Sequence, residues 1–99
     1  MNWDEIKEKY PKAFKQLQNW LHEENMIFKV GHIRDLYDFF DEQGIYGRVG
    51  KNQFMMFTWD LITDPEINIC EYSNYDYNTR PEAEEKLFLR AFEILEVKL

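Results

Sequence analysis

Residues 35–47, DLYDFFDEQGIYG, mark the point where the chain changes from a helical to a strand pattern. From about residue 32, apolar side chains recur at helical spacing. Those that share one face are Ile33, Leu36, Tyr37 and Phe40, with Phe39 beside them. Gly44 favours a helix end because glycine adopts the left-handed conformation at little cost. After Gly44 the period of the apolar residues becomes two, so the stretch predicts a helix that leads directly into a sheet.

The residues that follow predict three antiparallel strands. The segments IYGRV (45–49) and QFMMFTWDLI (53–62) alternate, and GKN (50–52) between them is typical of a hairpin turn. TDPE (63–66) predicts a second turn, and INICEYSNY (67–75) a third strand. In the long segment one side is wholly apolar and the other is mixed, which indicates a sheet covered on one face only. The apolar side consists of Met55, Phe57, Trp59 and Leu61.

Helices are predicted before and after these strands. Asn2 and Glu5 favour a helix start, and Pro11 ends that helix near Lys9 because the residue before a proline avoids helical geometry. A second helix begins at Pro11. Its core face consists of Ala13, Phe14, Leu17, Trp20 and Leu21. The segment NMIFKVGH, residues 25–32, fits either a short strand or a loop that buries Ile27 and Phe28.

The last helix, RPEAEEKLFLRAFEILEVKL (80–99), follows a capping box formed by Thr79 and Glu82. Its apolar stripe consists of Ala83, Leu87, Phe88, Ala91, Phe92, Ile94 and Leu95. Together these elements predict a single α+β domain over residues 1–99. Its expected architecture is a two-layer sandwich, in which a three-stranded antiparallel meander packs against N-terminal helices and a long C-terminal helix.

Composition restricts the class of protein. A net charge of −7 disfavours binding to nucleic acid and to anionic membranes. The single cysteine, Cys70, excludes an internal disulfide and a thiolate zinc cage, and its place within a strand predicts a buried, inert thiol. No apolar run is long enough to cross a bilayer, and the charged start MNWDEIKEKY does not resemble a signal peptide. We therefore expect a cytoplasmic protein.

Several groups of polar residues are candidates for a chemical site. Asp35, Asp38, Asp41 and Glu42 line one side of a helix, where solvated carboxylates tolerate each other without a cation. His22 and His32 lack the partners of a zinc site or a catalytic set. The glycines at 44, 47 and 50 precede a strand rather than a helix, so they indicate hairpin geometry and not a phosphate cradle. We expect no catalytic residue, no metal and no cofactor.

The strongest candidate for a contact surface is EYSNYDYN, residues 71–78, because rigid amphipathic rings lie among small polar groups. Its candidate partner-contact residues are Tyr72, Tyr75, Asp76 and Tyr77. Residues 52–79 contain five acids and no Lys or Arg, whereas basic residues gather in KEKYPKAFK near the N-terminus. Such a dipolar layout can orient a basic partner or a second copy of the chain.

Four segments carry a resemblance to a known group: the early tryptophan followed by KEKYPKAF, LYDFFDEQGIY, and the closing EAEEKLFLRAFEILEVKL. They resemble small uncharacterised proteins of phages, prophages and mobile elements of gut Bacteroidetes. The resemblance covers the helical parts at both ends and the DEQGI junction. It implies a bacterial or phage-infected cytoplasm and an accessory role, and it brings no catalytic or binding residue.

These observations favour a non-enzymatic interaction module that binds an unknown protein partner or itself. One alternative is an enzyme or small-molecule binder with a pocket between sheet and helices, bordered by Trp59 and the tyrosines. Another is an inhibitor that imitates the charge of DNA, for which −7 on 99 residues is a weak charge.

Overall fold

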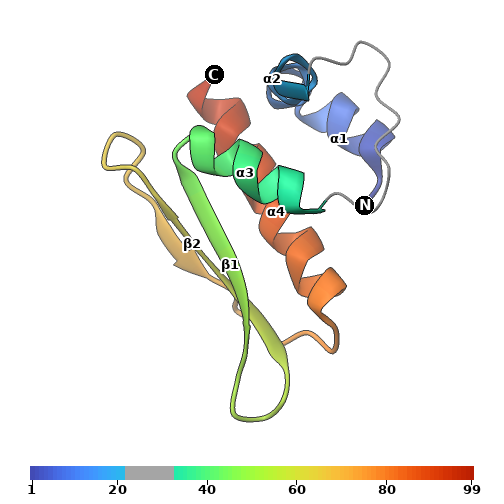
Figure 1. The fold of residues 1–99 in the computed structure, drawn as a ribbon, viewed down its shortest axis with the longest axis vertical. Helices are drawn as coiled ribbons and strands as arrows, with labels where there is room; N and C mark the ends of the chain where they lie inside the picture. The colour runs from blue at the N-terminus through green and yellow to red at the C-terminus, as the bar shows by residue number, and fades with distance from the viewer. Residues whose placement is uncertain (22–32) are drawn as a thin grey trace.

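The computed structural model of the chain describes residues 1–21 and 33–99, and in that part it has four helices and one three-stranded sheet (Figure 1). The helices are α1 (Trp3–Lys9), α2 (Pro11–Leu21), α3 (Ile33–Glu42) and α4 (Arg80–Lys98). The antiparallel strands are β1 (Ile45–Lys51), β2 (Phe57–Thr63) and β3 (Cys70–Tyr72), in the order β1-β2-β3. The predicted α+β fold with an antiparallel meander is confirmed. The two histidines and the strand or loop expected at residues 25–32 lie outside the described residues.

The helices cover one face of the sheet. α4 packs against both β1 and β2, α3 packs on β1, and α2 packs on α4 with α1 beside it. Figure 1 shows α1 and α2 on the side of α4 that faces away from the sheet. The first two helices therefore support α4, while α3 and α4 form the layer that touches the strands.

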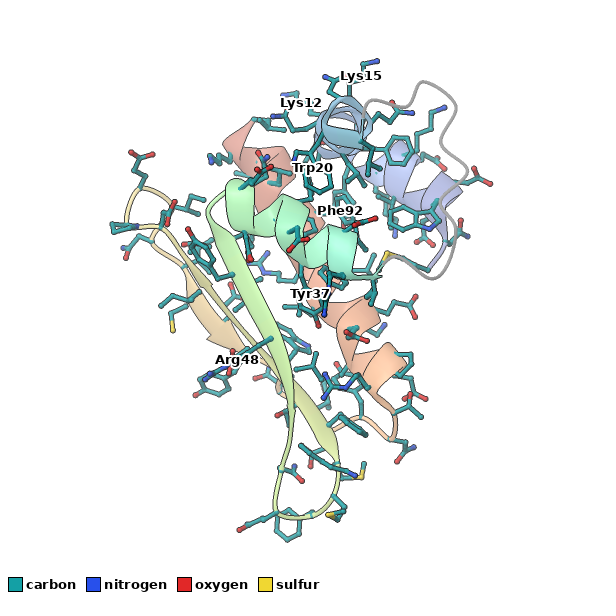
Figure 2. The ribbon with its side chains drawn as sticks, in the orientation of Figure 1. Lys12, Lys15, Trp20, Tyr37, Arg48 and Phe92 are labelled. Carbon is teal, nitrogen blue, oxygen red and sulfur yellow. The ribbon has the colours of Figure 1, made fainter. Side chains whose placement is uncertain are left out.

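The core lies between these layers and is rich in aromatic rings. α4 contributes most of it, and all seven residues predicted for its stripe are buried. Phe92 lies at the centre of the helical side (Figure 2), where its ring contacts those of Trp3, Tyr10 and Phe40. In α3 the buried residues are Leu36, Phe39 and Phe40, whereas Ile33, expected on the core face, is exposed at the first residue of the helix.

The hairpin between β1 and β2 differs from the prediction. β1 continues to Lys51, β2 begins only at Phe57, and the turn occupies the residues expected to start the second strand. The cause is Asn52, whose side-chain oxygen accepts hydrogen bonds from the backbone N–H groups of Phe54 and Met56. Such a side chain competes with the strand ladder for backbone donors. Phe54 and Met55 are consequently exposed in the turn.

The third strand is also shorter than the predicted 67–75. The carbonyl of Asp64 accepts hydrogen bonds from the N–H groups of Ile67 and Asn68, and this turn takes up the start of the segment. β3 then pairs with β2 over three residues only, with Cys70 opposite Ile62. Because both side chains lie on the uncovered face of the sheet, Cys70 is exposed, and the prediction of a buried thiol was wrong.

Candidate functional site

Three of the four predicted contact residues line a groove between α4 and the β3 edge of the sheet. Tyr72, Tyr75 and Tyr77 all border it, and its volume is about 350 Å³. Asp76, the fourth, is exposed but is not among the residues that line the groove. The groove is open to solvent along its length rather than closed over. It is therefore suited to a chain segment more than to an enclosed small molecule.

The sheet side of the groove is built from aromatic rings. Tyr77 is held next to β2 by two backbone hydrogen bonds of 2.8 Å with Phe57, which return the chain to the sheet after β3. Trp59 of β2 forms another part of this wall, and Tyr10, between α1 and α2, also borders the groove. Tyr72 and Tyr75 are 75% and 74% exposed, so a large ring area faces solvent here.

The opposite wall is one side of α4. Its residues are Lys86, Leu89, Arg90 and Glu93, which are spaced so that they fall on one face of a helix. Leu89 lies outside the main apolar stripe because it packs at this wall, next to the core. Leu89 stands out in the sequence as an apolar residue outside the main stripe, which can mark an interface, whereas Lys86, Arg90 and Glu93 were not predicted as site residues.

An ion-pair cluster ties this wall to β3. The Arg90 guanidinium donates two hydrogen bonds to the Glu71 carboxylate, at 2.9 Å and 2.6 Å, and lies 2.9 Å from a Glu93 oxygen. These hydrogen bonds hold the pKa of Glu71 below its ordinary value and raise the pKa of Arg90. The cluster therefore fixes the distance between α4 and the sheet edge along the groove.

We predict a pH-dependent contribution of this cluster to stability. Because the pKa of Glu71 is lower in the folded state, its ion pair stabilises the fold above the unfolded value near 4.5 and loses this effect as the pH falls through the folded value. Glu71→Gln should lower the free energy of unfolding by about 1 kcal/mol at pH 7, since both partners are about one third exposed. Urea unfolding at a series of pH values measures this difference.

The difference between the wild type and Glu71→Gln should shrink as the pH falls below 4.5. Glu66→Gln is the control, because Glu66 is an exposed acid in the turn before β3. We expect it to unfold like the wild type at every pH. A loss for Glu71→Gln that stays constant down to pH 3 would contradict the assignment.

Trp59 has an unusual hydrogen-bonding state. Its indole Nε1–H is buried and has no hydrogen-bond acceptor in the described part of the chain. Buried donors are nearly always paired, because an unpaired donor costs about 1–3 kcal/mol. Trp20, by contrast, donates its indole N–H to the Glu42 carboxylate and packs edge-on against Phe39. The unpaired donor thus belongs to a residue that lines the groove.

The other candidate groups do not converge on a site in the described residues. Asp38, Asp41 and Glu42 are exposed on α3, and partial burial together with Asp38 raises the pKa of Asp41. Within residues 1–21 and 33–99, no cluster of three or more His, Cys, Asp or Glu side chains is arranged to hold a metal ion. Gly44 has a positive φ of 78° at the end of α3, and Gly47 and Gly50 lie within β1 rather than in the turn of the hairpin.

A small cavity between the sheet and α3 and α4 has a volume of about 10 Å³ and is lined mainly by core residues such as Phe40, Leu61 and Leu87. That volume holds one water molecule at most. Among the described helices, none combines the length and hydropathy that a membrane span requires. No family model, curated protein or solved structure matches the chain.

Proposed function

We propose that the protein is a non-enzymatic interaction module of a bacterial or phage-infected cytoplasm, and that its groove binds an extended segment of another protein. The observation that carries this proposal is the indole N–H of Trp59, which is buried without an acceptor in the described residues and belongs to a side chain that lines the groove. If the indole ring turns toward the groove on binding, a ligand carbonyl that accepts this hydrogen bond would contribute about 1–3 kcal/mol to binding.

The chemistry of the lining supports a proline-containing segment. Four tyrosine rings and one indole ring in the lining offer flat apolar surface together with hydrogen-bond donors. They belong to Tyr10, Trp59, Tyr72, Tyr75 and Tyr77. A polyproline II segment has no internal hydrogen bonds, so its carbonyls are free to accept from such donors. Its pyrrolidine rings pack well on aromatic side chains, and its preformed shape reduces the entropy lost on binding. Lys86 adds one positive charge that suits an acidic residue in the same segment.

Two observations disfavour the alternatives raised by the sequence. The pocket expected beside Trp59 and the tyrosines corresponds to the groove, which is open to solvent, and there Glu71 and Glu93 are engaged with Arg90 rather than poised for proton transfer. For a DNA mimic, two carboxylates of the acidic region are neutralised, since Asp60 pairs with Arg48 and Glu71 with Arg90. These pairs weaken the row of charges that imitation of phosphates needs.

The proposal is tested by selecting from a displayed library of random 16-residue peptides and measuring the affinity of the winners by titration calorimetry. We expect proline-containing winners that lose at least tenfold in affinity for Trp59→Phe, because this variant keeps a ring but removes the donor. Trp20→Phe is the matched control, since it deletes an indole N–H that is bonded to Glu42 and lies outside the groove. It should bind like the wild type.

NMR provides a direct readout, because each of the three tryptophans gives its own indole N–H signal. The Trp59 signal should shift on peptide binding while that of Trp20 stays in place. If no peptide is enriched over a parallel selection on Trp59→Phe, or if winners bind both tryptophan variants equally, the groove is not the binding site.

A further inference from the structure

The face of the sheet that the helices leave uncovered has an unusual composition. It presents six residues from three strands, which we call the outer sheet face: Tyr46, Arg48, Asp60, Ile62, Cys70 and Tyr72. They bound a shallow concavity of about 600 Å³. Figure 2 shows Arg48 on the side of the sheet away from the helices. Ile62 is 56% exposed and lies between Tyr46 and Cys70, so the face has an apolar row where solvated sheets carry polar residues.

A charged pair lies beside this apolar row. The Nε atom of Arg48 donates to both oxygens of Asp60, each at 2.9 Å, and the two residues are directly opposite each other on β1 and β2. The Arg48 side chain is 83% exposed. Its terminal guanidinium nitrogens have no acceptor in the described residues, and Asp60 is itself about half exposed. The pair therefore offers both a free donor group and an accessible carboxylate.

We propose that the outer sheet face binds a second copy of the chain through a two-fold axis. A two-fold interface joins a surface to itself, so the surface must be complementary to its own rotated copy. An adjacent cation and anion meet this condition, because rotation places Arg48 of each copy near Asp60 of the other. The free guanidinium nitrogens then donate to the second carboxylate. A partner of uniform charge, such as nucleic acid, would leave one member of the pair opposed by a like charge.

The apolar row supplies the contact area for this association. Sheets that pack face to face lie about 10 Å apart with their strands nearly aligned, and their inner faces are apolar. Two copies joined in this way form four layers in the order helices, sheet, sheet, helices. Tyr46, Ile62 and Tyr72 would then move from solvent into the centre of the assembly. The groove shares Tyr72 with this face, but its tryptophan and α4 wall lie on the other side of the sheet, so Trp59→Phe separates the two sites.

Sedimentation equilibrium across a wide concentration range tests the proposal. The wild type should show a molar mass that rises with concentration from 12.2 kDa toward twice that value. Arg48→Glu and Asp60→Lys should each raise the dissociation constant at least tenfold, because each places like charges opposite one another across the axis. An equimolar mixture of the two variants should restore association, since the introduced glutamate then faces the introduced lysine while the remaining native arginine and aspartate face each other.

Restoration in the mixture separates an interface from a folding defect, and circular dichroism of each variant checks the fold directly. Cys70 gives a second readout, because its exposed thiol should react more slowly with a thiol reagent as the protein concentration rises. Trp59→Phe should associate like the wild type. A wild type that stays at 12.2 kDa up to millimolar concentration overturns the proposal, and so does a mixture that sediments like the separate variants.

Discussion

Phe92→Ala is expected to lower the free energy of unfolding by about 4 kcal/mol. Phe92 is fully buried in α4, and its ring makes edge-to-face contacts with Trp3 and Phe40 and a stacked contact with Tyr10. Truncation removes the transfer free energy of a large ring and leaves a cavity between three aromatic neighbours. Because these neighbours come from different elements, they cannot all collapse into the space at once.

A loss of this size is decisive for a chain of 99 residues, whose total stability is on the order of 5–10 kcal/mol. Urea unfolding followed by tryptophan fluorescence measures it. Val97→Ala is the control, since Val97 is an apolar residue of the same helix that is 84% exposed. It should change the free energy by less than about 0.5 kcal/mol. A loss below about 2 kcal/mol for Phe92→Ala would show that the helical side of the core repacks, contrary to the expectation.

The helices could be predicted well because their signals are local. Asn2 accepts a hydrogen bond from the N–H of Glu5, and Thr79 accepts one from Glu82, as the capping pattern indicated. Pro11 separates α1 from α2 as expected. The apolar stripe of α4 was visible from spacing alone. The bounds and the buried faces of these helices can therefore be predicted from local sequence.

The cap of α2 shows what local sequence cannot reveal. No residue just before Pro11 caps this helix; instead the Glu96 carboxylate accepts hydrogen bonds from the backbone N–H groups of Lys12 and Ala13. A negative charge at a helix N-terminus stabilises it by pairing free donors and by opposing the helix dipole. Glu96 lies in the last turns of α4, so only the packed fold brings the two together.

The candidate site was predictable in part for the same reason. The three tyrosines at 72, 75 and 77 were identified from composition, which is a local property. The α4 wall and the buried donor of Trp59 depend on how the helix crosses the sheet, so spacing alone did not assign them. Asp76 was included because it is acidic and close in sequence. The structure places it outside the groove lining.

Gly47→Val is expected to lower the free energy of unfolding by about 3 kcal/mol, somewhat less than Phe92→Ala does. Gly47 lies in β1 opposite Leu61 and faces α4, where a Cβ atom would lie 2.7 Å and 2.9 Å from the two terminal carbons of Leu87. Leu87 is itself buried, and the neighbouring cavity of about 10 Å³ cannot accept a displaced methyl group. The strand or the helix must therefore move.

Gly50→Val is a matched control in the same strand, because no atom lies within 4 Å of the position a Cβ would occupy there. It should leave stability unchanged or raise it slightly, since valine favours strands more than glycine does. Equal losses for the two valine variants would mean that strand geometry, not contact with α4, limits these positions.

A second substitution tests the contact itself. Leu87→Ala alone should lower the free energy of unfolding by about 3 kcal/mol, because it leaves a cavity. In the double variant the valine at position 47 fills part of that space, so the loss should be smaller than the sum of the single losses by at least about 1 kcal/mol. Leu87 follows Lys86 on α4, and the spacing between this helix and the sheet sets the width of the groove. Gly47→Val should consequently weaken peptide binding as well as stability, whereas Gly50→Val should leave binding intact.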